Sequence, residues 1–86
     1  MSNVKNEILK NVCYTKLVYG RINKKLNTSF SEAHIEKFIL YILKETDDDC
    51  ISKIGKNYYI TNIENGIRLT VNSNTFRIIT VDKISR

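Results

Sequence analysis

The side chains best suited to chemistry alternate along the C-terminal half of this sequence. They are arginine, tyrosine, hydroxyl and amide groups, and alternation predicts that they share one face of a sheet: Tyr59, Arg68, Thr70, Asn72, Thr75 and Arg77, with Lys56 at the edge of that face. Guanidinium groups bind phosphate through paired hydrogen bonds, and a tyrosine ring stacks under a base. The pattern predicts a nucleic-acid interface, for RNA first of all. The alternative stays open, because an exposed antiparallel face is normally polar.

RNA cleavage would need groups that deprotonate the 2′-hydroxyl, stabilise the phosphorane and protonate the leaving oxygen. Arg68 and Arg77 are candidates to clamp the phosphate, and Lys56 and Tyr59 are candidates to exchange a proton. The single histidine, His34, precedes the strands, in the first turn of a predicted helix, where we expect a surface or capping role. Without histidine in the strands, only a weak or ribosome-assisted nuclease stays open as an alternative to simple binding.

Neither a metal nor a cofactor is predicted. Asp47, Asp48 and Asp49 are adjacent acids, but no EF-hand spacing follows them, so we expect a solvated loop. Cys13 and Cys50 lack the spacing of a zinc site. We expect free thiols, with a disulfide between these two residues as the alternative. No Walker, dinucleotide-binding or metalloprotease motif is present.

The chain is basic, with 14 Lys and Arg against 9 Asp and Glu and a net charge of +5. This balance favours an anionic partner, either nucleic acid or an acidic protein. Lys16, Arg21, Lys24 and Lys25 make the second predicted helix a cationic flank, which either grips a phosphate backbone or is a solvated helix surface.

Three helical segments are predicted in the first half. The clearest covers residues 32–45, where apolar residues recur at helical spacing and Ser31 precedes them as a cap: Ile35, Phe38, Ile39, Ile42 and Leu43. Phe30 and Ile35 occupy the positions of a hydrophobic staple. A first segment covers residues 3–12. A second covers residues 16–26, with Thr15 as its cap, with Leu17, Val18, Ile22 and Leu26 on one side, and with Gly20 weakening it.

After the three acids the sequence predicts strands at residues 51–54, 58–63, 67–72 and 75–83. Asn65-Gly66 is typical of a two-residue type I′ hairpin, and Ser73-Asn74 suggests a second tight turn. Ile60 would then oppose Val71, and Leu69 would oppose Ile78. One face becomes apolar and suits the third helix: Tyr58, Ile60, Ile67, Leu69, Val71, Phe76 and Ile78. The other carries the polar residues named above with Thr61, and an apolar end made of Ile63, Ile79 and Val81.

These elements predict one α+β domain over residues 1–86, with two or three helices (3–46) packed on one face of a three- to four-stranded antiparallel meander (51–84). No signal-peptide core and no membrane span is found, so we expect a cytoplasmic protein that does not bind a membrane. A homodimer would bury more surface, but no residue pattern requires one.

Two stretches of the strand half, GKNYYI (55–60) and TVNSNTFRIIT (70–80), resemble a bacterial family called domain of unknown function 3781. Residues 13–15 and 21–27 are also similar to members of that family. The resemblance covers nearly the whole chain and implies a fold but no activity. A weaker resemblance links the closing strand and the Gly-Lys entry to small toxin ribonucleases of the barnase and RelE-like group. It implies RNA cleavage at the matching positions Lys56, Arg68, Thr75 and Arg77.

Two functional hypotheses follow from the sequence. In the first, the domain binds RNA through the polar sheet face and Lys56, with toxin-like endoribonuclease activity as an extension. In the second, it is a small interaction module, such as a regulator from a mobile element, that binds an acidic protein without catalysis. The apolar end formed by Ile63, Ile79 and Val81 would be the mark of the second hypothesis.

Overall fold

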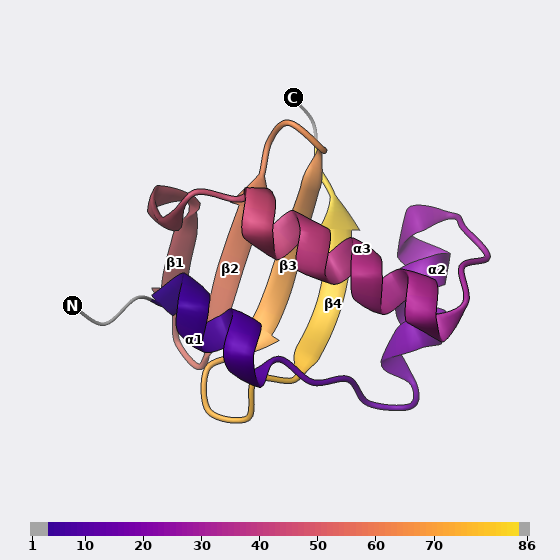
Figure 1. The fold of residues 1–86 in the computed structure, drawn as a ribbon, viewed down its shortest axis with the longest axis horizontal. Coiled ribbons are helices and arrows are strands. Elements are labelled where there is room, and N and C mark those ends of the chain that lie inside the picture. Colours follow the sequence, from indigo (N-terminus) through magenta and orange to yellow (C-terminus); the bar gives the residue numbers. More distant parts are fainter. Residues whose placement is uncertain (1–3, 85–86) are drawn as a thin grey trace.

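Helices precede a four-stranded sheet in the computed structural model, which describes residues 4–84 (Figure 1). The helices are α1 (Val4–Asn11), α2 (Val18–Leu26) and α3 (Glu32–Glu45), followed by the short 3₁₀ helix η1 (Asp48–Cys50). The strands are β1 (Ile51–Ile54), β2 (Asn57–Asn62), β3 (Ile67–Asn72) and β4 (Ile78–Lys83). Neighbouring strands are antiparallel in the order β1-β2-β3-β4, so the predicted class, helices before an antiparallel meander, is confirmed. The predicted helix start at Asn3 lies outside the described residues.

Helix α3 has the predicted bounds and the predicted cap. The Ser31 hydroxyl accepts a hydrogen bond from the backbone N–H of His34 at 3.1 Å, which satisfies one of the unpaired donors of the first turn. Four residues of the predicted stripe are fully buried: Ile35, Ile39, Ile42 and Leu43. Phe30 packs against this core and stacks on the His34 ring at a centroid distance of 4.0 Å. The helix therefore lies across the sheet with its apolar side inward.

Helix α2 differs from its prediction at its first turn. It begins at Val18, and Leu17 occupies the N-cap position without a side-chain hydrogen bond, so the predicted Thr15 cap is wrong. Val18, Ile22 and Leu26 are buried, but Leu17 is 80% exposed. One residue rotates a helix by about 100°, and this turns Leu17 away from the buried side.

The β2–β3 connection is longer than the predicted type I′ turn. Gly66 has a left-handed φ of 64°, but Asn65 does not share it, and residues 63–66 form the loop. The Asn62 carboxamide oxygen holds this loop by accepting bonds from the Asn65 backbone and side chain at 2.9 and 3.0 Å. Ile60 opposes Leu69 rather than Val71. Because the shift is even, every side chain of β2 and β3 keeps its predicted face.

The β3–β4 connection also departs from the predicted two-residue turn. The Asn72 carboxamide oxygen accepts bonds from the backbone N–H groups of Asn74 and Thr75, each at 2.8 Å. Phe76 then takes a left-handed φ of 59°, which is unusual for a bulky side chain. As a result β4 begins at Ile78 rather than at Thr75.

A β-bulge follows at once and changes the face of the rest of β4. Val71 opposes Ile78, whereas Thr70 opposes Thr80, so Ile79 is the extra residue. Val81 consequently points to the core, where it is fully buried opposite Leu69. Its predicted place on the polar face is wrong. The prediction assumed a regular strand, and the one extra residue of the bulge moves every later side chain of β4 to the other face.

The core lies between the sheet and the helices. It contains buried residues from all three helices and from β2, β3 and β4: Ile8, Val18, Ile22, Leu26, Ile35, Ile39, Ile42, Leu43, Ile60, Ile67, Leu69, Val71, Ile78 and Val81. Helices α1 and α3 lie over one face of the sheet, and α2 lies beside β4 at its edge (Figure 1). Within residues 4–84, the helices are too short and too polar to cross a bilayer.

Candidate nucleic-acid interface

The face of the sheet opposite the core carries two of the predicted site residues in accessible positions. Cross-strand pairing aligns Ser52, Tyr59, Thr70 and Thr80 in one row. Arg68 follows in the next row and is exposed, and Tyr59 is half-buried. Thr70 is only 5% exposed between them, which removes it as a ligand contact. Because no helix of the described chain covers this face, the longer side chains around Thr70 must shield it.

The side chains of Asn72 and Thr75 stabilise the β3–β4 loop by accepting hydrogen bonds from its backbone. The Asn72 carboxamide oxygen is occupied by the two loop N–H groups, and the Thr75 hydroxyl accepts a bond from the Arg77 backbone at 3.3 Å. Lys56, in the turn between β1 and β2, accepts bonds at its carbonyl from the backbone and the hydroxyl of Ser73 at 2.8 and 2.9 Å. These contacts gather Lys56, Ser73 and Thr75 at one end of the sheet.

Arg77 lies just before β4, where the segment between α1 and α2 pairs with its backbone. Cys13 forms an isolated parallel bridge to Arg77. The Cys13 N–H donates to the Phe76 carbonyl at 2.9 Å, and the Cys13 carbonyl accepts from the Ile78 N–H at 3.0 Å. Arg77 is exposed and lines a cleft together with residues of α2. That Arg77 and Arg68 share the sheet face stays a prediction.

Arg77 and Arg21 line one cleft between α2 and the start of β4. The cleft has a volume of about 240 Å³ and is lined by Thr15, Leu17, Val18, Arg21, Arg77, Ile78 and Ile79. We call it the basic cleft. Its lining combines two arginines and one threonine with aliphatic residues. Arginine remains protonated throughout the accessible pH range, so these groups can bind an anion but cannot exchange a proton with it.

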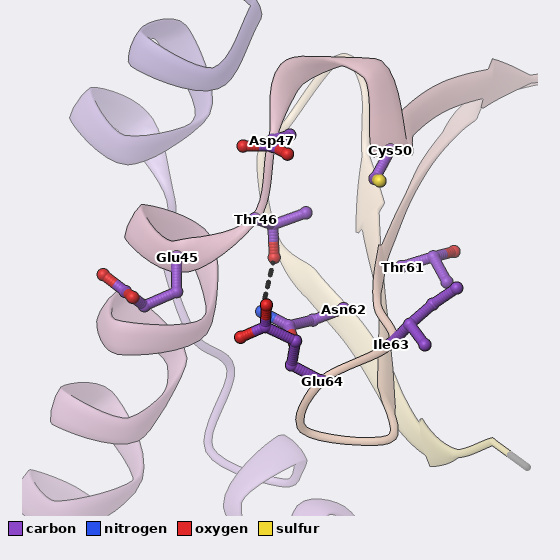
Figure 2. A pocket seen from close by; sticks show the side chains of 8 residues that line it. All are labelled: Glu45, Thr46, Asp47, Cys50, Thr61, Asn62, Ile63 and Glu64. Atoms are coloured by element: carbon purple, nitrogen blue, oxygen red, sulfur yellow. Dashed lines mark hydrogen bonds between the residues drawn. The ribbon is translucent and has the colours of Figure 1, made fainter. Parts of the chain in front are cut away.

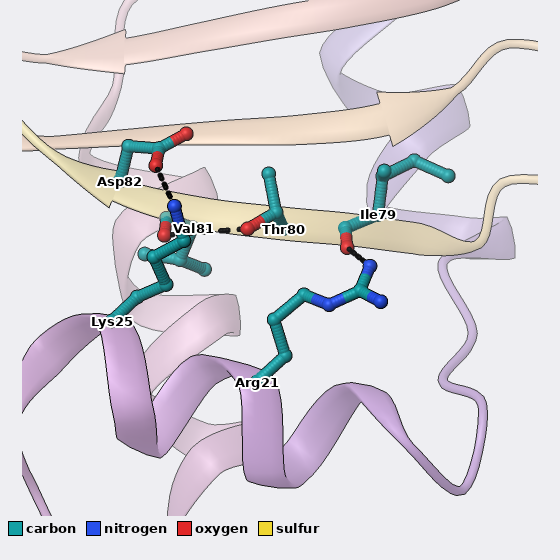
Figure 3. A network of polar contacts seen from close by, with 6 residues as sticks. All are labelled: Arg21, Lys25, Ile79, Thr80, Val81 and Asp82. Atoms are coloured by element: carbon teal, nitrogen blue, oxygen red, sulfur yellow. Dashed lines mark hydrogen bonds and ion pairs between the residues drawn. The ribbon is translucent and has the colours of Figure 1, made fainter.

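Helix α2 is held against the sheet edge by two polar contacts (Figure 3). The Arg21 guanidinium donates to the carbonyl of Ile79 at 3.1 Å, and the bulge leaves that carbonyl facing the helix. Lys25 forms an ion pair with Asp82 at 3.1 Å. Both partners of this ion pair are well exposed, so its contribution to stability is small, but it fixes the direction of α2 along β4.

The sequence predicted the basic residues of α2 but not that Arg77 lies near one of them, Arg21. Lys16, Arg21, Lys24 and Lys25 were predicted as a basic flank, and Arg77 was placed on the sheet. Their meeting depends on the bulge and on the Cys13 bridge, and neither has a sequence signature as clear as a helix stripe. The stretch that contains the bulge, Ile78-Ile79-Thr80-Val81, is rich in β-branched residues and is equally typical of a regular strand.

A second, smaller pocket lies at the other end of the molecule, where α3 ends (Figure 2). It has a volume of about 170 Å³ and is lined by Glu45, Thr46, Asp47, Cys50, Thr61, Asn62, Ile63 and Glu64. Polar groups of this pocket bond to one another and to α3. Asn62 donates to the Thr46 hydroxyl at 3.0 Å, and that hydroxyl donates to the Ile42 carbonyl at 2.6 Å. Within the described residues, no group of three or more acids, histidines and cysteines could hold a metal ion.

Two tyrosines, Tyr14 just before α2 and Tyr19 within it, have raised pKa values, and the Tyr14 hydroxyl is buried without a hydrogen-bond partner among the described residues. The Tyr19 hydroxyl donates to the Glu36 carboxylate at 2.7 Å, and this bond raises the pKa of Tyr19 to about 12. Burial and the nearby Glu36 raise the pKa of Tyr14 still further. Both tyrosines therefore stay protonated at neutral pH. Cys13 and Cys50 are both free thiols and exposed, so the alternative of a disulfide between them is wrong.

The apolar end predicted for an interaction module does not form. Val81 is in the core, Ile79 lines the basic cleft, and Ile63 lies in the β2–β3 loop at the opposite end of β4. Each of the three residues is thus in a different environment.

Comparison with known proteins gives one match. No curated protein and no solved structure matches the chain. A family described as "Protein of unknown function (DUF3781)" matches residues 6–82, which include all the helices and strands except the first two residues of α1 and the last residue of β4. This match confirms the resemblance seen in the sequence, whereas the resemblance to toxin ribonucleases finds no counterpart. The chain belongs to the DUF3781 family.

Proposed function

We propose that this domain binds RNA through the basic cleft. The observation that carries the proposal is the convergence of Arg21 and Arg77 from elements distant in sequence onto one cleft. Two guanidinium groups on a cleft of this size suit a phosphate, because each can donate two parallel hydrogen bonds.

The remaining walls of the basic cleft suit a ribonucleotide. Thr15 supplies a hydroxyl that can pair with a ribose 2′-hydroxyl, and this is the group that distinguishes RNA from DNA. Leu17, Val18 and Ile78 supply aliphatic surface for a sugar or a base. Lys16 and Lys24 are exposed nearby on the same helix region, where they would add non-specific attraction to the backbone.

Binding is supported better than cleavage. The four candidate catalytic residues lie in three places: Lys56 in the β1–β2 turn, Tyr59 and Arg68 on the open sheet face, and Arg77 in the basic cleft. General acid–base catalysis needs its groups within hydrogen-bond reach of one substrate. The groups that do converge are guanidinium groups, which hold phosphate in place.

The test compares two exposed arginines of this chain. Arg77→Gln should weaken binding of a short oligouridine by roughly tenfold or more, the effect of losing a charged hydrogen bond. Arg68→Gln, on the open sheet face, is the matched control and should bind as the wild type does. Fluorescence anisotropy between about 50 and 200 mM salt should also show the slope of log affinity against log salt falling by about 0.7 in the Arg77 variant.

Three results would count against the proposal. Wild-type protein that binds no oligouridine at low salt overturns RNA binding altogether. A loss confined to the Arg68 variant moves the interface to the sheet face. Equal affinity for the corresponding deoxyoligonucleotide overturns the assignment of RNA and leaves a site for phosphate backbones in general.

A further inference from the structure

Helix α2 has a glycine that neither its backbone nor its packing requires. Gly55 and Gly66 have left-handed φ values of 62° and 64°, which side chains rarely adopt. Gly20 has no such angle, and a Cβ built there would meet no other side chain and no backbone beyond its own helix within 4 Å. Apart from proline, glycine is the least favourable residue inside a helix. Within the described residues, no contact explains its presence in the first turn of α2.

Gly20 lies in a basic recess on the outer side of α2. The recess is open, has a volume of about 710 Å³, and is lined by Gly20, Arg21, Lys24 and Lys25. Lys24 is one turn beyond Gly20 and is therefore on the same side of the helix. The helix carries no acid from Val18 to Leu26. A molecule lying in this recess would meet bare main chain at Gly20 and positive charge beside it, from Arg21, Lys24 and Lys25.

An exposed leucine borders the same surface. Leu17, one turn before Gly20, is 80% exposed and lines the basic cleft. Arg21 lines both the cleft and the recess, so the two meet along this side of α2. The surface from Leu17 through Gly20 and Arg21 to Lys24 offers an apolar contact, a point without a side chain, and two cations. Charge selects a polyanion, and the missing side chain allows a bulky backbone to lie close to the helix.

We infer that Gly20 is the point of closest approach between this domain and the sugar–phosphate backbone of its RNA. This inference rests on the proposed function and extends it from the basic cleft to the outer side of α2. The phosphate held by Arg21 and Arg77 continues into a strand whose next backbone unit lies over Gly20, with the Lys24 ammonium beside it. Any side chain at position 20 would push that strand away from both cations.

The experiment adds bulk at this position in steps. Gly20→Ala and Gly20→Leu are titrated with the same oligouridine, and Ala33→Leu, at an exposed position of α3, controls for added bulk elsewhere. Gly20→Ala should raise the melting temperature by roughly 4–8 °C because alanine favours the helix. It should nevertheless weaken binding about tenfold, as loss of one charged contact does, and Gly20→Leu should weaken it more. Ala33→Leu should leave affinity unchanged.

The outcomes separate this inference from the proposed function. If wild-type protein binds and Arg77→Gln weakens binding, but Gly20→Ala binds as the wild type does, the inference is overturned and the proposed function stands. If wild-type protein does not bind oligouridine, both fall. A titration of unmodified protein followed by amide NMR gives an answer even if a variant misfolds. The Gly20 amide should be among those that shift most, and an unmoved Gly20 amide would overturn the inference.

Discussion

Two asparagine side chains set the shape of the loops at opposite ends of the sheet. Asn62 accepts bonds from Asn65, and Asn72 accepts bonds from the backbones of Asn74 and Thr75. In both cases one carboxamide oxygen takes the place of a backbone acceptor, which is how this residue type stabilises turns. The loop after β3 leads directly to Arg77, which lines the basic cleft. Asn72 therefore helps to position Arg77, the residue for which we propose a contact with the ligand.

Asn72→Ala should destabilise the domain by about 1–2 kcal/mol, because two backbone donors lose their acceptor. Asn72→Asp should restore most of that loss, since a carboxylate oxygen can accept both bonds. Urea denaturation of the two variants measures the difference. Equal losses in both would mean that the carboxamide oxygen does not hold the loop.

The hydrogen bond from Tyr19 to Glu36 should contribute to the free energy of unfolding in a way that changes at alkaline pH. The pKa of Tyr19 is raised from 10.0 to about 12 in the folded protein, so the folded state holds this proton more tightly than the unfolded state does. The stabilisation is complete below the unfolded pKa and is lost as the pH rises from 10 to about 12.

Melting temperatures across that pH range should therefore fall less steeply for Tyr19→Phe than for the wild type. Because Tyr19→Phe removes only this phenol, the difference between the two proteins isolates its contribution. Identical slopes would show that the hydrogen bond to Glu36 does not hold the Tyr19 proton.

At the scale of elements, α3 is the main source of buried apolar surface among the helices, with four fully buried side chains. Ile39→Ala should destabilise the domain by roughly 2–5 kcal/mol, through lost burial and the cavity left behind. Tyr41→Ala on the same helix is the control, because Tyr41 is 50% exposed and should cost much less. Chemical denaturation measures both, and an Ile39→Ala protein as stable as the wild type would contradict the packing of α3.

The elements themselves could be predicted, and their connections could not. The α3 stripe and the β3 strand follow from side-chain periodicity, which reflects burial on one side. The loops depend on which carboxamide accepts which N–H, as at Asn62 and Asn72, and sequence alone does not distinguish this from a tight turn. An error of this kind at the β3–β4 loop hid the cleft that Arg77 and Arg21 line together.

At the scale of the whole molecule, the pockets differ in the charge of their lining. The recess on α2 is lined by Arg21, Lys24 and Lys25, and the pocket at the end of α3 includes Glu45, Asp47 and Glu64. Helix α2 and the end of α3 lie apart along the longest dimension, which is 38 Å (Figure 1). A basic lining attracts a polyanion before contact, and an acidic lining repels it.

The Cys13 bridge also has a consequence for folding kinetics. It joins the start of the chain to the β3–β4 loop, and the Cys13 thiol contacts the Thr75 carbonyl across 62 positions. Closing so long a loop costs chain entropy, so contacts of this kind form late, after the local helices and the hairpins. The basic cleft lies beside this contact, between α2 and the start of β4, so we expect it to be assembled late in folding. A collapsed intermediate with its helices and its sheet in place would still lack the basic cleft.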